Sequence, residues 1–128
     1  MTNKNRAFNA YKEQQLQSKV NLSKPEELTL ILYEELVKNL LKAKLNLESE
    51  NKSYEVINNC LIKSQEIILV LKNTLDFNYE ISNNLNKLYD YLIELIINAN
   101  RTKEVENLEI VIELAKELRD TWKKVTVK

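Results

Sequence analysis

The chain has 128 residues, of which 19 are basic and 19 acidic, so its formal net charge is zero. A neutral chain lacks the positive field that gathers nucleic acid or an anionic membrane surface, and we expect neither as a partner. The sequence also has no glycine and no histidine, which excludes glycine-rich phosphate loops and Ser-His or Cys-His catalytic pairs.

Residues 1–22 precede the first strong helix signal and are mainly polar. Phe8 and Tyr11 lie in this run, where no amphipathic helix long enough to bury them has begun. We predict that residues 1–22 form a mobile amino-terminal segment or short helix whose aromatic side chains cover a binding surface on the rest of the protein.

The first long helix is expected to begin at Ser23. The run Ser23-Lys24-Pro25-Glu26 forms a capping box, in which the serine hydroxyl and the glutamate carboxylate each accept a hydrogen bond from the other residue's backbone amide. Proline is tolerated in the first turn because its missing N–H would have no partner there. This helix should run to about Glu48.

Three further helices follow, because apolar residues recur at alternating spacings of three and four. The seams are Ile57, Leu61, Ser64, Ile68, Leu71 and Leu75; then Ile81, Leu85, Leu88, Leu92, Leu95 and Ala99; then Leu108, Val111, Ala115, Leu118, Trp122 and Val125. The connections at 49–51, 76–79 and 100–102 are short, so consecutive helices should pack as antiparallel neighbours. We predict an all-α, antiparallel up-down four-helix bundle that forms one domain over residues 23–128.

The second helix, expected from about Lys52 to Leu75, has a wider apolar face than one seam requires. Residues that flank its seam widen the apolar arc to about 180°: they are Val56, Cys60, Ile67 and Val70. One interpretation is that a small bundle buries such wide arcs in its own core. The other is that grooves between the helices hold an amphipathic helix of another protein.

Catalytic and metal chemistry is not expected. The acidic row Glu106, Glu109, Glu113 and Glu117 has lysines nearby and is interpreted as a solvated face. Cys60 is the only cysteine, which excludes an internal disulfide and fits a reducing compartment; it is interpreted as a small apolar residue rather than a nucleophile. We expect no cofactor and no metal.

The remaining aromatic residues are assigned mainly to packing. Trp122 lies on a seam and should be part of the core. Tyr89 and Tyr91 are more typical of bundle packing than of recognition, although a phenol at a groove edge combines apolar area with a hydrogen-bonding tip. The opening MTNKNRAFNA has no apolar run that could act as a signal peptide, and IILVL at 67–71 is too short to span a bilayer. We therefore expect a cytoplasmic protein without membrane insertion.

Four stretches that cover nearly the whole chain carry a resemblance to a known family. They are NAY ending at Tyr11, SKPEELTLILYEEL at 23–36, NLNKLYDYLIELIINAN at 84–100 and LRDTWKKV at 118–125. Their combination resembles the flagellin-specific secretion chaperones of the FliS family. The resemblance implies a non-enzymatic helical bundle of the bacterial cytosol that binds the disordered carboxy-terminal segment of flagellin, prevents its premature polymerisation and delivers it to the flagellar type III secretion apparatus.

The resemblance also implies that the Ala-Tyr pair near the amino terminus acts at the flagellin-binding surface and can cover it when empty. The predicted partner-binding residues, which form the groove and its amino-terminal cap, are Phe8, Ala10, Tyr11, Tyr33, Val56, Cys60, Ile67, Val70 and Tyr91. The flagellar export gate is a further candidate partner, and a monomer or weak dimer is expected.

Two alternatives remain open from the sequence. The extra apolar surface could instead form a non-catalytic homodimeric scaffold without an export role. An enzyme built on a metal-carboxylate bundle is disfavoured, because the histidine ligands of such sites are missing.

Overall fold

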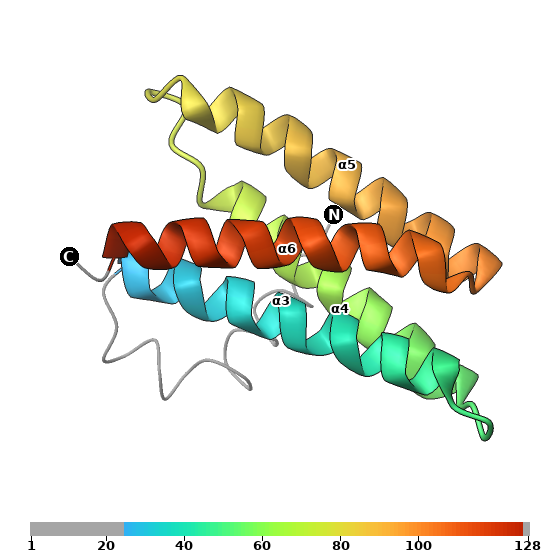
Figure 1. Cartoon of the computed structure of the whole chain (residues 1–128). Helices are drawn as coiled ribbons and strands as arrows, with labels where there is room; N and C mark the ends of the chain where they lie inside the picture. Colours follow the sequence, from blue (N-terminus) through green and yellow to red (C-terminus); the bar gives the residue numbers. More distant parts are fainter. Residues whose placement is uncertain (1–24, 127–128) are drawn as a thin grey trace.

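The computed structural model describes residues 25–126. This part of the chain forms four helices, which are α3 (Pro25–Glu48), α4 (Tyr54–Asn73), α5 (Ile81–Thr102) and α6 (Val105–Thr126). Successive helices run in opposite directions (Figure 1), as predicted from the short connections. The expected segment 1–22 and the capping box at Ser23 lie outside the described residues.

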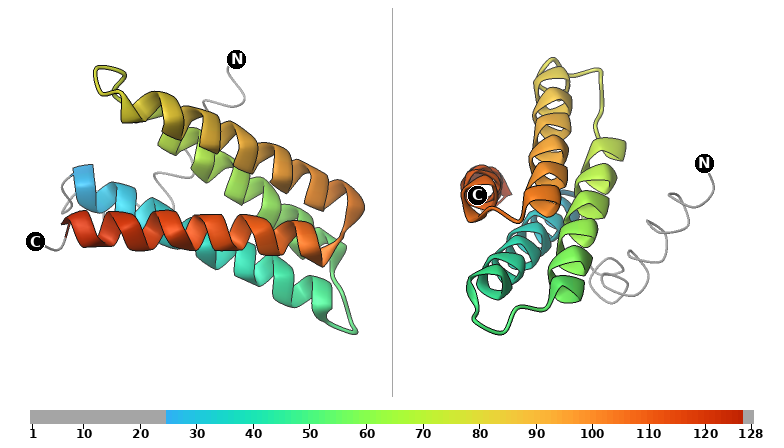
Figure 2. Two further views of the ribbon diagram at one scale, coloured as in Figure 1. Left: turned by 45° about the horizontal axis from the view of Figure 1, so that its top comes forward. Right: turned by 90° about the vertical axis from the view of Figure 1, so that its right-hand side faces the viewer.

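The helices form a closed ring in which each helix packs against the next and α6 returns to α3. Figure 2 shows that the α4–α5 pair lies apart from α3 and α6 at the end where α3 begins and α6 ends, and approaches them at the other end. We call this wider end the open end of the bundle. Within the described residues, no helix combines the length and apolar character needed to cross a bilayer.

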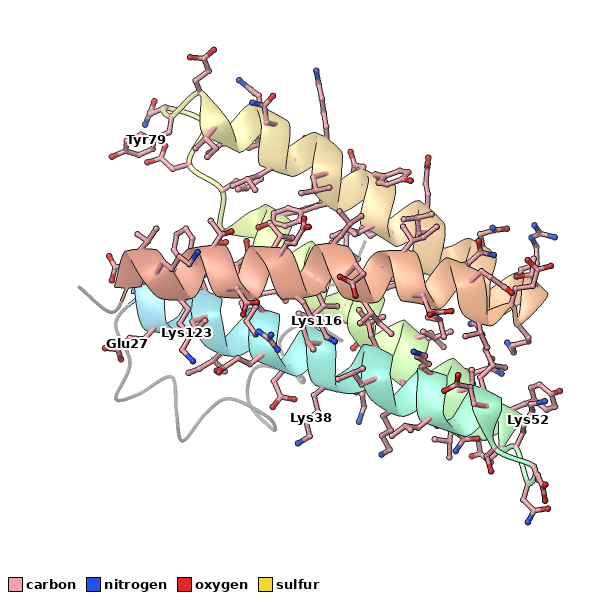
Figure 3. All side chains as sticks on the ribbon, in the orientation of Figure 1. Glu27, Lys38, Lys52, Tyr79, Lys116 and Lys123 are labelled. Carbon is pink, nitrogen blue, oxygen red and sulfur yellow. The ribbon has the colours of Figure 1, made fainter. Side chains whose placement is uncertain are left out.

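The core runs along the centre of the bundle and is built mainly from aliphatic side chains. Leu32, Leu36 and Leu40 of α3 are fully buried, as are the predicted seam residues Leu61 and Ile68 of α4. Lys38 and Lys52 are exposed instead, and Figure 3 shows both pointing away from the bundle. This division of apolar and charged side chains is the one that the helical periodicity predicts.

Ser64 is a polar residue within this core and is fully buried. Its Oγ donates a hydrogen bond to the Cys60 carbonyl oxygen at 2.8 Å. The hydroxyl therefore satisfies its donor within its own helix, which is how a serine can occupy a seam position.

Three helix boundaries differ from the prediction. Helix α4 ends at Asn73, with Thr74 as its C-cap, rather than near Leu75. Helix α4 begins at Tyr54 rather than near Lys52, because Ser53 is its N-cap and its Oγ accepts from the Val56 amide at 3.2 Å. The predicted connection at 100–102 is wrong, because α5 continues through Thr102.

The chain reverses between α5 and α6 at Lys103, whose φ of 59° and ψ of 32° are left-handed. Glycine is the usual residue at such a helix end, but the chain has none. The Lys103 amide donates to the Ala99 carbonyl at 2.8 Å. Its Nζ donates to Asn58 Oδ1 on α4 at 2.8 Å and also to Asn100. These contacts hold a non-glycine residue in the turn.

Two predicted seam residues do not belong to the core. Ile81 is 63% exposed and Val125 is 56% exposed. Ile81 is the first residue of α5 and Val125 lies in the last turn of α6. These two helix ends lie at the open end, where the α4–α5 pair is separated from α3 and α6 (Figure 2).

Candidate partner-binding site

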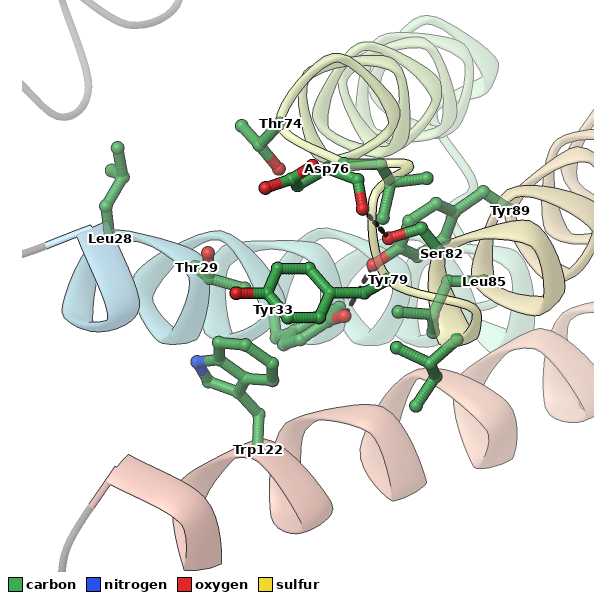
Figure 4. A pocket seen from close by; sticks show the side chains of 12 residues that line it. Leu28, Thr29, Tyr33, Thr74, Asp76, Tyr79, Ser82, Leu85, Tyr89 and Trp122 are labelled. Atoms are coloured by element: carbon green, nitrogen blue, oxygen red, sulfur yellow. Dashed lines mark hydrogen bonds between the residues drawn. The ribbon is translucent and has the colours of Figure 1, made fainter.

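A pocket of about 310 Å³ lies at the open end of the bundle (Figure 4). It is bounded by the first turns of α3, the connection between α4 and α5, the start of α5, and α6 near its carboxyl end. The lining residues are Leu28, Thr29, Tyr33, Thr74, Leu75, Asp76, Tyr79, Ile81, Ser82, Leu85, Tyr89 and Trp122. We call it the end pocket.

The end pocket contains a buried pair of phenol groups. The hydroxyl oxygens of Tyr33 on α3 and Tyr89 on α5 are 2.5 Å apart and share a hydrogen bond, and each residue is only 2% exposed. Burial raises the pKa of both phenols above its ordinary value, because ionised oxygen would lose its hydration, and the proximity of Tyr33 raises the pKa of Tyr89 further. Both hydroxyls are therefore neutral at physiological pH.

Trp122 links the two helices that border the pocket on the α3 side. Its indole Nε1 donates to the carbonyl oxygen of Glu26, in the first turn of α3, at 2.8 Å. Its ring meets the ring of Tyr33 edge-on, with centroids 6.4 Å apart and an interplanar angle of 69°. This geometry is a favoured one for aromatic pairs, so Trp122 fixes the start of α3 against α6.

The connection between α4 and α5 forms the opposite border of the pocket. Ser82 Oγ donates to the Asp76 carbonyl oxygen at 2.6 Å, and the Asn78 amide donates to Asp76 Oδ1 at 3.0 Å. Among residues 25–126, Asp76 is the only charged residue that lines the pocket. Tyr79 is exposed and lies at the pocket in the close view (Figure 4).

The predicted site residues are distributed over different environments. Tyr33 lines the end pocket, and Tyr91 on α5 is 48% exposed. Cys60, Ile67 and Val70 are buried within the bundle, while Val56 is half-buried. The remaining three predicted residues, Phe8, Ala10 and Tyr11, lie outside the described residues.

Burial of these α4 residues favours the interpretation that the bundle itself uses the wide apolar arc, because α4 has a helical neighbour on each side, α3 and α5. Contact of Cys60, Ile67 and Val70 with a partner stays a prediction, and it would require neighbouring helices to move. Tyr33 is as buried as these α4 residues but lines the end pocket. Tyr91 is exposed on the surface of α5.

Several pocket residues were not predicted as functional. Tyr89 and Trp122 were assigned to packing, and Leu28 and Tyr79 were not considered. Tyr33 and Tyr89 are 56 positions apart and Trp122 and Glu26 are 96 apart, so no local pattern joins them. The sequence signal that could have found the site is a group of large apolar residues in and directly after a predicted connection: Phe77, Tyr79 and Ile81. The structure leaves all three side chains exposed, and Tyr79 and Ile81 line the pocket.

The acidic row on α6 is a solvated face, as predicted, with all four carboxylate side chains exposed. Lys44 Nζ lies 3.8 Å from Glu109 Oε2. Between residues 25 and 126, no group of three or more potential ligands is placed to hold a metal ion.

Comparison with known proteins assigns the chain to a family. A family model described as flagellar protein FliS matches residues 7–128. The chain belongs to the FliS family. It is 36% identical over 107 residues to the flagellar secretion chaperone FliS of Bacillus subtilis, a match that covers 84% of this chain and 79% of the relative. It is also 26% identical over 121 residues to the flagellar secretion chaperone FliS of Vibrio cholerae, covering 93% and 88% of the two chains.

The fold agrees with this assignment. A crystal structure of a bacterial flagellar chaperone superposes on the chain with a TM-score of 0.70 and 21% identity, and the match covers 94% of each chain. The predicted all-α helical bundle is confirmed. FliS is a family of chaperones, which confirms that the chain is not an enzyme.

Proposed function

We propose that this protein is a flagellar export chaperone that binds the disordered carboxy-terminal segment of flagellin in the bacterial cytoplasm. By covering that segment it prevents premature polymerisation, and it delivers flagellin to the flagellar type III secretion apparatus. Family membership supports the chaperone role. The observation that carries the binding role is the end pocket, an apolar cavity that opens at the surface between four parts of the bundle.

The physical basis of binding is the burial of apolar surface. A disordered segment that folds on binding loses conformational entropy, which costs several kcal/mol and is typically offset by burying about 1,000 to 3,000 Å². The end pocket can hold one anchoring side chain, and exposed apolar residues of α5 outside it, such as Tyr91 and Ile97, add contact area. An anchor in a pocket surrounded by weaker contacts is the usual distribution of binding energy at an interface.

The amino-terminal segment is proposed to compete with flagellin. Residue 25 begins α3 at the rim of the end pocket, where Leu28 and Thr29 contribute to the lining. The segment that carries Phe8 and Tyr11 therefore joins the bundle beside the proposed binding surface. Its aromatic side chains are suited to an apolar surface that flagellin leaves vacant.

The flagellar export gate is proposed as a second partner, which would receive the chaperone with its client. We propose that the free protein is a monomer or weak dimer. Light scattering on a dilution series tests this point, because a dimer that persists on dilution would favour the homodimeric scaffold.

Isothermal titration calorimetry with the carboxy-terminal segment of flagellin from the same organism tests the binding role. We expect saturable one-to-one binding with a negative heat-capacity change, which marks the burial of apolar surface. The same titration with Tyr11→Ala, and with residues 1–20 deleted, tests the competition, which predicts a change in affinity for both. Absence of binding by the unaltered protein would refute the proposed function.

A further inference from the structure

The tyrosine pair in the end pocket has one hydrogen-bond donor to spare. Each phenol carries one proton, and the bond between Tyr33 and Tyr89 uses only one of the two. The hydrogen bonds of the described residues provide no acceptor for the second proton. A donor buried without an acceptor is costly, so an acceptor that enters the pocket gains a hydrogen bond to a phenol that is itself only 2% exposed.

The electrostatics of the pocket favour a neutral group inside and a positive group at the rim. Both phenols stay protonated, and no lysine or arginine from the described part of the chain lines the cavity. Asp76 supplies the single charge, and its carboxylate lies on an exposed connection. A carboxylate on the partner would be repelled there, whereas an ammonium or guanidinium group would be attracted.

The size of the cavity limits the occupant to about one large side chain with its adjoining main chain. A cavity of about 150 Å³ is sufficient to hold benzene, and the end pocket measures about 310 Å³. A phenyl or branched aliphatic side chain therefore fits with space for the neighbouring peptide group.

We propose that the end pocket selects client segments in which a bulky apolar residue stands next to a lysine or arginine. The apolar side chain fills the cavity, a backbone carbonyl beside it accepts the spare proton of the tyrosine pair, and the basic side chain lies against Asp76. This inference rests on the proposed chaperone function and adds the sequence class that the site recognises.

The hydroxyl requirement is tested with Tyr33→Phe, Tyr89→Phe and the double variant, which all keep the aromatic rings. In either single variant the remaining phenol still has a proton to donate. We therefore expect at least one single variant to bind the flagellin segment within about twofold of the unaltered protein, and the double variant to lose about five- to tenfold. Circular dichroism verifies that each variant is folded, and removing both partners leaves no orphaned hydroxyl to destabilise the double variant.

Occupation of the cavity is followed through the fluorescence of Trp122. It is the only tryptophan in the chain and it lines the end pocket, so a flagellin segment prepared without tryptophan gives a signal from this site alone. We expect the emission maximum to shift on binding, at concentrations that match the calorimetric titration.

The charge requirement is tested with Asp76→Asn and with Glu80→Gln as a matched control. Both positions are exposed residues of the same connection, but only Asp76 lines the pocket. We expect Asp76→Asn to weaken binding about two- to fivefold at low salt, with no such loss at 1 M salt. Glu80→Gln should stay within about twofold of the unaltered protein under both conditions.

The outcomes separate this inference from the proposed function. Calorimetric binding with no change in Trp122 emission, or a folded double variant that binds as tightly as the unaltered protein, would overturn the inference and leave the chaperone function standing. Equal affinities for Asp76→Asn and Glu80→Gln would overturn the requirement for a basic neighbour. No calorimetric binding by the unaltered protein would refute both the function and the inference.

Discussion

Replacement of Trp122 tests how firmly the open end of the bundle is held together. The residue links α3 and α6 through one hydrogen bond to the Glu26 carbonyl and one edge-on contact with Tyr33. Trp122→Phe removes the indole N–H but keeps an aromatic ring. Trp122→Ala removes both interactions, so the two variants separate the bond from the ring.

The two expected losses in the free energy of unfolding differ in size. The Glu26 carbonyl lies in the first turn of α3, where it can still accept a hydrogen bond from a backbone amide of the same helix. Loss of the indole donor therefore leaves no buried polar group without a hydrogen-bond partner. We expect Trp122→Phe to cost about 0.5 to 1 kcal/mol. The aromatic contact adds about 0.5 to 1.5 kcal/mol, and the half-buried ring also loses its transfer energy. We expect Trp122→Ala to cost about 2 to 4 kcal/mol.

Urea unfolding measures both losses. It is followed by far-ultraviolet circular dichroism because both variants lack the only tryptophan and so give no tryptophan fluorescence signal. Thr121→Ala, at an exposed neighbouring position on α6, serves as the control and should change stability by less than about 0.5 kcal/mol. A loss below about 0.5 kcal/mol for Trp122→Ala would show that the link does not stabilise the fold. Equal losses for the two variants would refute the separation of bond and ring.

Three further predictions concern the rest of the bundle. Ser53→Ala removes the N-cap bond to the Val56 amide and should cost about 1 kcal/mol in urea unfolding, whereas a change below about 0.3 kcal/mol would argue against the cap. Ile67→Ala should lower the free energy of unfolding by about 2 to 5 kcal/mol because the side chain is fully buried, and a much smaller loss would mean that Ile67 is not packed in the core. The raised pKa values of Tyr33 and Tyr89 predict that stability is unaffected by these groups below about pH 10 and falls above it, since unfolded tyrosine then loses its proton first. Unfolding curves from pH 8 to 11.5 measure this fall in the free energy of unfolding. An equal fall in the Tyr33→Phe/Tyr89→Phe double variant would show that these two tyrosines do not cause it.

The fold could be predicted from the sequence because helical periodicity and short connections are local signals. The apolar seams placed the helices correctly, and α3 ends at Glu48 as expected. The error at residues 100–102 arose because Asn-Arg-Thr is polar and resembles a connection. Polar residues can also extend a helix at its solvent-exposed end. The chain reverses instead at Lys103, where the left-handed backbone is formed by a lysine and no glycine in the sequence indicates the turn.

The candidate site was harder to predict because it is assembled from distant segments. The width of the apolar arc on α4 was correctly recognised, but periodicity does not say which neighbouring helix covers each edge, and Cys60, Ile67 and Val70 are buried. The end pocket depends on how far the helix pairs separate, and that separation has no sequence signal of its own. Of the predicted site residues that the structure describes, Tyr33 alone lines the pocket.

The ring closure between α3 and α6 has a consequence for synthesis of the protein. The end pocket needs the first turns of α3 and the side chain of Trp122 near the far end of α6, so it cannot exist on a growing chain until α6 has left the ribosome. Contacts between consecutive helices can form earlier because they are local. A partly synthesised chain would therefore be helical but would lack this pocket, and the client binding that we propose for it would begin only when translation of the bundle is complete.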